Sequence, residues 1–314
     1  MASGAPAPAL RATPADLVLL GVLSVLWGAA YIFIREGIVL GASPILFGAA
    51  RYALSAVAFF LLAAARREAF PSRRALAASL AIGGVLVIGL YGGFLYWGEQ
   101  FTTGGYAAVL ASTAPILTVV FAFTLLPAER LSPLGLVGIL IGFAGTIVLV
   151  VPQLKGSAVG TWPGPAFMIG AYVSAAIGSV LLRRWGAGPQ GLWQIGGQFG
   201  VAAALLGAAA LVLPVPETLP RSAGVLGALA ALVLLSSTAG YFVYFRLHHR
   251  VGPVLANTVA YLVPLVGIAI GSGLFGEPVT VYELVGFLIV VVGVTLVLRH
   301  PARPAPAPPI PSKT

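Results

Sequence analysis

The chain has 314 residues, of which 59% are hydrophobic and only 8% are charged, and its formal net charge is +9. A soluble domain carries about 25% charged residues, so this composition excludes an ordinary soluble protein and indicates a chain surrounded by lipid. Cysteine is absent, which excludes disulfides, thiol catalysis and cysteine–zinc sites. The basic residues lie in short loops and form no basic run, so we expect no nucleic-acid partner.

Ten apolar segments follow one another along the chain. Each is apolar on every face, which is typical of membrane-spanning helices and not of barrel strands. We predict spans at 17–34, 44–65, 75–97, 102–126, 133–151, 163–182, 190–213, 222–245, 253–275 and 280–298. Another span follows the first one closely, so we interpret the first as a retained span and not as a cleavable signal peptide. Segments 1–15 and 300–314 are rich in proline, and we expect both to be disordered.

The positions of the basic residues predict an orientation. With both termini in the cytoplasm, the inner loops hold 13 of the 17 Lys and Arg residues and the outer loops hold 3, while Arg51 lies within a span. Cytoplasmic loops of membrane proteins carry an excess of Lys and Arg. We therefore predict a multi-pass protein of the cell inner membrane with both ends in the cytoplasm.

The second half of the chain repeats the first. Four residues recur 148 or 149 positions later: Pro115 as Pro264, Glu129 as Glu277, Gly138 as Gly286 and Gly145 as Gly293. Each copy holds five predicted spans, an odd number, so the second copy begins on the opposite side of the membrane. We predict two inverted repeats, residues 16–152 and 157–299, an arrangement typical of secondary transporters.

Short motifs inside the repeat add a family resemblance. They are Trp27-Gly28, Ser43-Pro44, Arg51, Ala114-Pro115 and Glu129-Arg130 in the first copy, and Val263-Pro264 and Gly276-Glu277 in the second. Across residues 15–299 the chain resembles the drug/metabolite transporter superfamily, in its ten-span family with two EamA-type domains. The resemblance implies transport without implying a substrate, since known members export amino acids, other metabolites or toxic compounds and some import. The second copy departs from the first, with Ala175 in place of Trp27 and Phe199 in place of Arg51.

Catalytic groups are sparse in this sequence. The three histidines lie at predicted cytoplasmic ends, Asp16 is the single aspartate, and no HExxH motif occurs. We therefore expect no enzyme, no metal site and no cofactor. A buried carboxylate is the usual proton carrier of antiporters, and the nearest to a span centre is Glu99, at the outer end of the third span. Glu99 is either a solvated helix end or a gating or proton-coupling group.

Polar and aromatic side chains within the spans form the candidate binding site. Polar groups in contact with lipid would find no hydrogen-bond partner, so we expect these side chains to face a cavity or another helix. Arg51 either binds a substrate carboxylate or extends toward the headgroups and fixes helix packing. Rings with hydroxyls and amides suit an amphipathic or zwitterionic solute. The substrate-binding candidates are Trp27, Tyr31, Arg51, Tyr91, Ser112, Tyr172, Trp193, Ser237, Tyr241, Asn257 and Tyr261.

Two prolines join Glu99 as gating or coupling candidates. Pro115 and Pro264 each lack a backbone donor, which frees a carbonyl one turn upstream. Their matched positions after polar residues make them either hinges or static kinks.

The sequence thus predicts an all-α integral membrane protein with ten transmembrane helices in two inverted five-helix repeats. We expect a secondary transporter that exports small metabolites, amino acids or related amphipathic solutes first among them, by alternating access. Its partners are a small-molecule substrate and the lipid bilayer, and it is a monomer or a homodimer. The alternatives are an importer of nucleosides or other metabolites, a multidrug exporter, and a membrane receptor or scaffold without transport.

Overall fold

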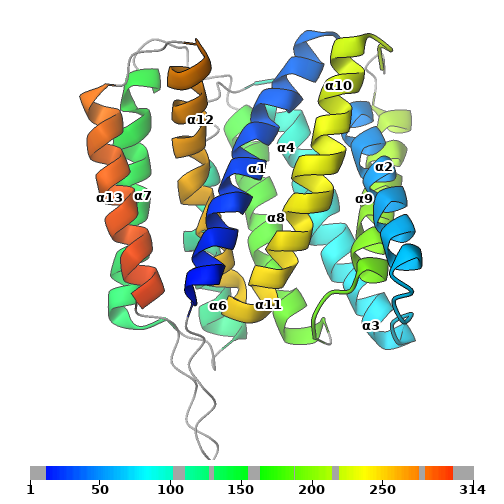
Figure 1. The fold of residues 1–314 in the computed structure, drawn as a ribbon, viewed down its shortest axis with the longest axis horizontal. Helices are drawn as coiled ribbons and strands as arrows, with labels where there is room; N and C mark the ends of the chain where they lie inside the picture. The colour runs from blue at the N-terminus through cyan, green and yellow to red at the C-terminus, as the bar shows by residue number, and fades with distance from the viewer. Residues whose placement is uncertain are drawn as a thin grey trace, which may run out of the picture.

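A computed structural model describes residues 12–101, 110–126, 131–154, 163–186, 188–213, 219–275 and 280–299. These residues form helices and short connections, with no strand among them. The helices stand side by side as one bundle, and α1 begins at the same end of the bundle at which α13 finishes (Figure 1). The matched acidic residues Glu129 and Glu277 lie outside the described residues, as do segments 1–11 and 300–314.

The helices follow the order of the apolar segments. The first half contains α1 (Pro14–Val39), α2 (Pro44–Ala65), α3 (Arg73–Ala78), the π-helical segment η1 (Ser79–Leu90), α4 (Tyr91–Glu99), α6 (Ala114–Leu125) and α7 (Pro133–Leu154). The second half contains α8 (Pro163–Trp185), α9 (Leu192–Val212), α10 (Ala223–Ala231), the π-helical segment η3 (Leu232–Gly240), α11 (Tyr241–Asn257), α12 (Val259–Phe275) and α13 (Val281–Arg299). Segments α3, η1 and α4 follow one another without a break, and so do α10, η3 and α11.

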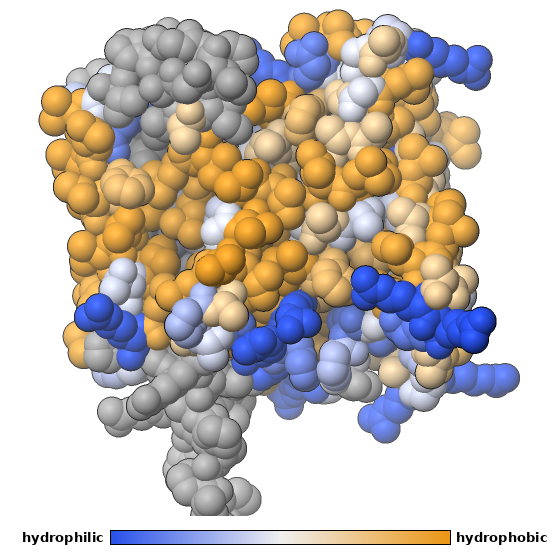
Figure 2. Space-filling model, viewed as in Figure 1, coloured by the Kyte–Doolittle hydropathy of each residue, from blue (hydrophilic) through white to orange (hydrophobic). Residues whose placement is uncertain are grey.

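The surface of the bundle is that of a membrane protein. Within the described residues, seven continuous helical stretches are long and apolar enough to cross a bilayer, and Ala114–Leu125 and Pro133–Val148 are shorter apolar helices. Hydrophobic residues cover the middle of the bundle, while hydrophilic residues gather at its ends, most visibly where α1 begins (Figure 2). Water would penalise such an apolar belt, whereas lipid accommodates it.

Capping explains where α1 and α13 begin. The Thr13 amide donates to Asp16 Oδ2 at 2.9 Å and the Asp16 amide donates to Thr13 Oγ1 at 3.4 Å, which is a capping box. Thr280 and Glu283 repeat the arrangement at α13, with 2.6 Å from the Thr280 amide to Glu283 Oε2. Helix α1 therefore starts at Pro14, inside the segment 1–15 for which we expected disorder.

A break interrupts α11 near its end. Gly252 has φ of +83°, a left-handed conformation that side chains other than that of glycine rarely adopt, and Pro253 follows inside the helix. The segment 253–257 then continues to Thr258, where a turn leads into α12. The predicted ninth span, 253–275, therefore contains the end of α11 as well as α12.

Small residues allow a close contact between two helices. Helices α7 and α13 pack along the edge of the bundle, side by side in Figure 1. A methyl group added at Gly293 would lie 2.7 Å from the Gly138 carbonyl oxygen, so neither helix has room for a side chain there. On the other side, α2 packs on α9, where the rings of Phe59 and Phe199 stack with centroids 5.6 Å apart.

Candidate functional site

A cavity lies in the middle of the bundle and is lined by residues from both halves of the chain. The cavity has a volume of about 90 Å³. This volume has room for several water molecules, which fits a small solute. Its polar or aromatic lining residues are Trp27, Tyr31, Arg51, Tyr52, Tyr91, Tyr172, Ser236, Tyr241, Tyr244 and Asn257.

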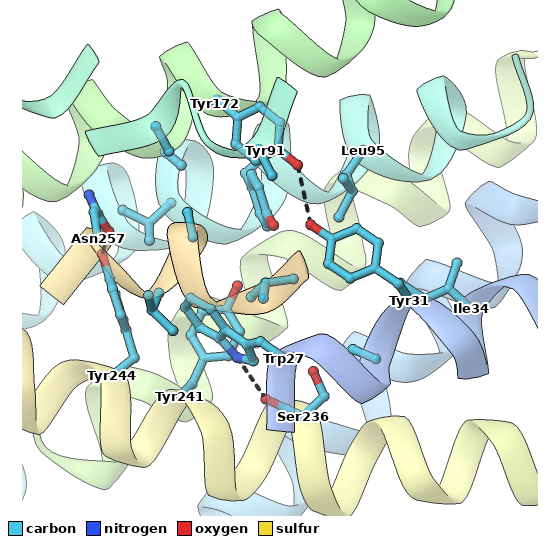
Figure 3. A pocket seen from close by; sticks show the side chains of 18 of the residues that line it. Trp27, Tyr31, Ile34, Tyr91, Leu95, Tyr172, Ser236, Tyr241, Tyr244 and Asn257 are labelled. Carbon is cyan, nitrogen blue, oxygen red and sulfur yellow. Dashed lines mark hydrogen bonds between the residues drawn. The ribbon is translucent and has the colours of Figure 1, made fainter. Parts of the chain in front are cut away.

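Aromatic rings form much of the wall (Figure 3). The Trp27 ring packs against those of Tyr241 and Tyr244, with centroids 5.3 and 5.2 Å away, and its Nε1 donates to the Ser236 carbonyl oxygen at 3.3 Å. Gly240 makes this position possible, since a methyl group there would lie 2.7 Å from Trp27 Nε1.

A second aromatic group faces Trp27 across the cavity. The hydroxyls of Tyr31 in α1 and Tyr172 in α8 lie 3.2 Å apart and share a hydrogen bond, and the rings of Tyr91 and Tyr172 are 6.0 Å apart. These tyrosines therefore join α1, α4 and α8 around one face of the cavity, with hydroxyls and ring faces available to a solute.

Arg51 carries the charge of the cavity wall. Its side chain is only 5% exposed, and all three guanidinium nitrogens donate to neutral hydroxyls. Nε donates to Ser237 Oγ at 2.8 Å, Nη2 to Ser236 Oγ at 2.8 Å and Nη1 to the Tyr96 hydroxyl at 3.1 Å. The two serines are consecutive residues of η3, so α2 holds the π-helical segment through one guanidinium group.

A polar layer extends from the cavity along α11. The Tyr244 hydroxyl donates to Asn257 Oδ1 at 3.2 Å, and Asn257 Nδ2 donates to Thr118 Oγ1 at 2.8 Å and to Ser179 Oγ at 3.2 Å. One turn beyond Tyr244, His248 Nε2 lies 2.8 Å from the Ser179 carbonyl oxygen. This layer ties α6, α8 and α11 together beside the cavity.

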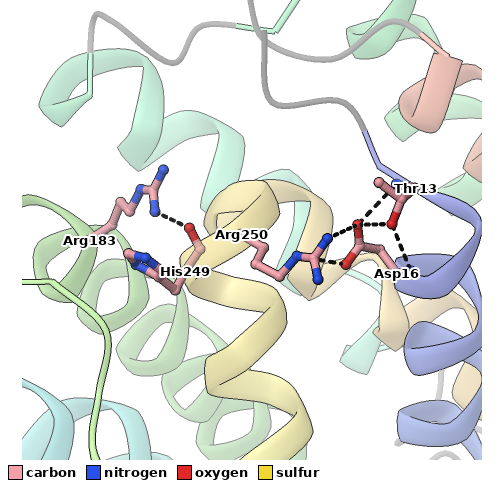
Figure 4. Close-up of polar contacts among 5 residues, drawn as sticks. All are labelled: Thr13, Asp16, Arg183, His249 and Arg250. Atoms are coloured by element: carbon pink, nitrogen blue, oxygen red, sulfur yellow. Dashed lines mark hydrogen bonds and ion pairs between the residues drawn. The ribbon is translucent and has the colours of Figure 1, made fainter. Parts of the chain in front are cut away.

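Charged groups join helices at the end of the bundle at which α1 begins. Asp16 pairs with Arg250, with 3.1 Å between Asp16 Oδ1 and Arg250 Nε (Figure 4). Arg183 donates to the His249 carbonyl oxygen, and Arg184 Nη1 donates to the Leu125 carbonyl oxygen at 2.9 Å. These contacts hold α1, α6, α8 and α11 against one another.

The structure brings most of the predicted binding residues together. Seven of them line the cavity: Trp27, Tyr31, Arg51, Tyr91, Tyr172, Tyr241 and Asn257. Ser237 stands behind Arg51 as its hydrogen-bond acceptor.

Three other candidates lie away from the lining. Ser112 is buried just before α6. Trp193 Nε1 donates to the Glu68 carbonyl oxygen at 3.0 Å, and the Tyr261 hydroxyl donates to the Ile139 carbonyl oxygen at 2.8 Å. In both cases a backbone carbonyl satisfies the polar end of an aromatic side chain.

The gating and coupling candidates also stand outside the lining. Glu99 ends α4, and its Oε1 is buried without a hydrogen-bond partner. Pro115 lies in the first turn of α6, where its missing amide hydrogen costs no helical bond, whereas Pro264 lies inside α12. The two matched prolines thus differ in position: Pro115 is at a helix start and Pro264 is within a helix.

Three of the polar or aromatic lining residues were absent from the list of substrate-binding candidates, namely Tyr52, Ser236 and Tyr244. Tyr52 adjoins Arg51 in the sequence, and Ser236 and Tyr244 flank the predicted Ser237 and Tyr241. A hydroxyl inside an apolar run was the available signal for each of them. Helix α2 contributes both Arg51 and Tyr52 to the wall.

Comparison with known proteins gives this arrangement a context. The model of the EamA-like transporter family matches residues 16–151 and again 162–299. The inner membrane transporter YedA of Escherichia coli is 30% identical over 91% of this chain and 92% of its own length, and the transporter YvbV of Bacillus subtilis is 24% identical over 89% and 90%. Protein PecM of Dickeya dadantii is 25% identical over 66% and 69%.

A solved crystal structure shares the fold. It superposes with a TM-score of 0.71 at 21% identity, and the match covers 91% of this chain and 96% of the other. Three findings agree that this is a membrane transporter of one family. The fold is a helical bundle with an apolar belt, it contains a central cavity, and one family model matches both halves of the chain. The chain belongs to the EamA-like transporter family.

Proposed function

We propose that this protein is a secondary transporter of the cell inner membrane that exports small metabolites, amino acids or related amphipathic solutes first among them. The central cavity carries the proposal, because aromatic rings, hydroxyls, one amide and one guanidinium converge on a space of solute size. The relative YedA is named an inner membrane transporter, which supports the location.

Alternating access between two inverted repeats is the proposed mechanism, with ten spans and both termini in the cytoplasm. The two family matches support one repeat in each half, at 16–151 and 162–299. The π-helical segments η1 and η3 support it too, since each lies in the third predicted span of its copy. The boundaries we propose are 16–152 and 157–299.

The pattern of helix contacts supports the same symmetry. Helix α1 packs on α12 and its counterpart α8 packs on α6, the counterpart of α12. Helix α7 packs on its own counterpart α13, and α2 on its own counterpart α9, as pairs near a two-fold axis would. Gly92 and Gly240, 148 positions apart, each leave room for an aromatic side chain, Tyr52 and Trp27 respectively.

Contacts at the end of the bundle where α1 begins support a gating role there. In the proposed orientation this end faces the cytoplasm, and the layer around Asn257 and the pair of Asp16 with Arg250 would have to separate before the cavity could open toward it. Glu99, Pro115 and Pro264 remain the proposed gating or coupling residues. The buried and unpaired oxygen of Glu99 is the observation in favour of its part.

Transport assays in proteoliposomes test this function. The purified protein would be given a panel of radiolabelled amino acids, nucleosides and cationic drugs, with and without a pH gradient. We expect flux of an amino-acid class solute, and we expect the double variant Tyr241→Ala with Asn257→Ala to abolish it, because both side chains line the cavity.

The matched control is Phe287→Ala in α13, since that ring is exposed on the outside of the bundle and faces lipid in our proposal. Flux of nucleosides or cationic drugs alone would favour the other transport classes. Absence of flux for every class would contradict transport and favour a receptor or scaffold.

A further inference from the structure

Arg51 is the charged side chain of the described cavity lining. The other lining residues are apolar, aromatic, a serine and an asparagine. Its side chain is 5% exposed and enters the wall from α2, between η3 and α4. A buried charge is strongly unfavourable unless an opposite charge and hydrogen bonds compensate it.

The bonds of Arg51 leave part of its binding capacity free. A guanidinium has five N–H donors, and three of them reach Ser236, Ser237 and Tyr96. One N–H on each terminal nitrogen remains, which is the number that a bidentate carboxylate requires. The present partners are hydroxyls, so they orient the guanidinium group without neutralising it.

No acidic side chain among the described residues pairs directly with Arg51. In the part of the chain that the structure describes, Arg51 donates its hydrogen bonds to three hydroxyls and to no acidic side chain, and Glu99 is not among the lining residues. An anion that enters the cavity therefore meets a cation that is already oriented and incompletely paired. Arginine is suited to this role because its planar group matches the geometry of a carboxylate.

We propose that Arg51 binds the carboxylate of the transported solute, and that the apolar or aromatic part of the solute packs among Trp27, Tyr91 and Tyr241. The inference rests on the proposed transport function and adds a chemical requirement to it. The substrate carries a carboxylate and is small, in keeping with a cavity volume of about 90 Å³.

A series of three solutes with the same side chain tests the requirement. They are an aromatic amino acid, its carboxamide and its decarboxylated amine. Binding to the purified wild-type protein is measured in detergent by calorimetry, so that the result does not depend on flux. We expect the acid to bind roughly tenfold or more tightly than the amide and the amine, because hydrogen bonds to charged groups are the stronger ones.

Variants of the site separate solute binding from helix packing. Arg51→Gln should bring the ratio of acid affinity to amide affinity close to one. Arg51→Lys should leave an intermediate ratio, since lysine keeps the positive charge but cannot form the two parallel hydrogen bonds of a guanidinium group. The double variant Ser236→Ala with Ser237→Ala keeps the guanidinium and should keep a preference for the acid. This ratio reports selectivity and is independent of the amount of folded protein.

The outcomes are distinguishable from failure of transport itself. Equal binding of acid, amide and amine to the wild type would overturn the assignment of Arg51, even if proteoliposomes showed flux. A preference for the acid that persists unchanged in Arg51→Gln would also overturn it. Selective binding without flux would support the Arg51 site and contradict the transport proposal.

Discussion

Asp16 and Arg250, 234 positions apart in the chain, form an ion pair that joins the start of α1 to the end of α11. Asp16 is 2% exposed and Arg250 is 39% exposed, so the pair lies at the boundary between bundle and solvent. Asp16 also belongs to the capping box of α1, and Arg250 precedes the break at Gly252 by two residues. One carboxylate therefore fixes both a helix start and a contact between helices.

The first prediction concerns this pair. Asp16→Asn keeps a side-chain oxygen for the cap but removes the charge that attracts Arg250, so α1 and α11 should separate more often at this end. An ion pair of this kind contributes up to about 1 kcal/mol, or about a fivefold change in an equilibrium. Because the chain has no cysteine, Ser179→Cys provides a single labelling site beside Asn257. We expect about fivefold faster maleimide labelling of this cysteine with Asp16→Asn.

Glu283→Gln is the matched control for Asp16→Asn. Glu283 occupies the same capping position in α13, and the structure gives it no ion pair within the described residues. Its substitution should leave the labelling of Ser179→Cys unchanged. Equal rates in both variants would show that the pair of Asp16 and Arg250 does not hold this end closed.

The second prediction concerns Gly240. Gly240→Ala places a methyl group 2.7 Å from Trp27 Nε1, so the indole must move and its bond to the Ser236 carbonyl oxygen is lost. We expect several-fold weaker solute binding, because Trp27 is part of the cavity wall, together with about 1–3 kcal/mol of destabilisation from overpacking. Calorimetry and thermal unfolding in detergent measure the two effects.

Gly227→Ala in α10 is the companion variant for Gly240→Ala. A methyl group at Gly227 meets nothing within 4 Å, so it should be neutral or stabilising by about 0.5–1 kcal/mol through helix propensity alone. If Gly240→Ala behaved like Gly227→Ala in both measurements, the described position of Trp27 would be wrong.

The third prediction concerns the contact of α7 with α13. Gly293→Ala introduces a methyl group 2.7 Å from the Gly138 carbonyl oxygen, and a rigid backbone cannot yield as a flexible side chain would. The helices must move apart, at a cost of about 1–3 kcal/mol. Thermal unfolding in detergent should show a lower midpoint, whereas Gly207→Ala, which meets nothing within 4 Å, should not lower it. An unchanged midpoint for Gly293→Ala would argue against this helix contact.

The fourth prediction separates two tyrosines. Tyr261→Phe removes the hydrogen bond to the Ile139 carbonyl oxygen, so it should lower stability by about 1 kcal/mol. Tyr261 does not line the cavity, so solute affinity should stay within about twofold of the wild type. Tyr91→Phe, inside the lining, should weaken binding of a solute that uses the hydroxyl. A large affinity change in Tyr261→Phe together with none in Tyr91→Phe would contradict the described cavity.

Apolar runs predicted the helices well where chain breakers mark their ends. The predicted segments 44–65 and 190–213 compare with Pro44–Ala65 and Leu192–Val212. The first helix extends beyond the predicted 17–34, because its last turns carry Arg35 and Glu36 and its first turn is fixed by the capping box. The polar residues Arg35 and Glu36 ended the predicted apolar segment, although the helix continues to Val39.

Local geometry was harder to predict than helix position. The amino-acid sequences of Ser79–Leu90 and Leu232–Gly240 do not distinguish π-helical from α-helical turns, since both segments consist of apolar or small residues. The sequence predicted that polar and aromatic groups face the interior, and Trp27, Tyr31 and Tyr91 do meet there. The sequence could not distinguish these lining residues from Trp193 and Tyr261. Only the fold shows that the polar atoms of Trp193 and Tyr261 already donate to backbone carbonyl groups.

Because η3 is π-helical, the composition of the cavity wall depends on the number of residues in this segment. Deleting one residue between Leu232 and Gly240 would favour ordinary α-helical turns, and every later position of that span would then rotate by about 100° around the helix axis. Tyr241 and Tyr244 would leave the cavity wall and His248 would leave Ser179, although no lining residue had been substituted. Relatives that differ by a single insertion or deletion at this point should therefore present a different set of side chains to their solutes.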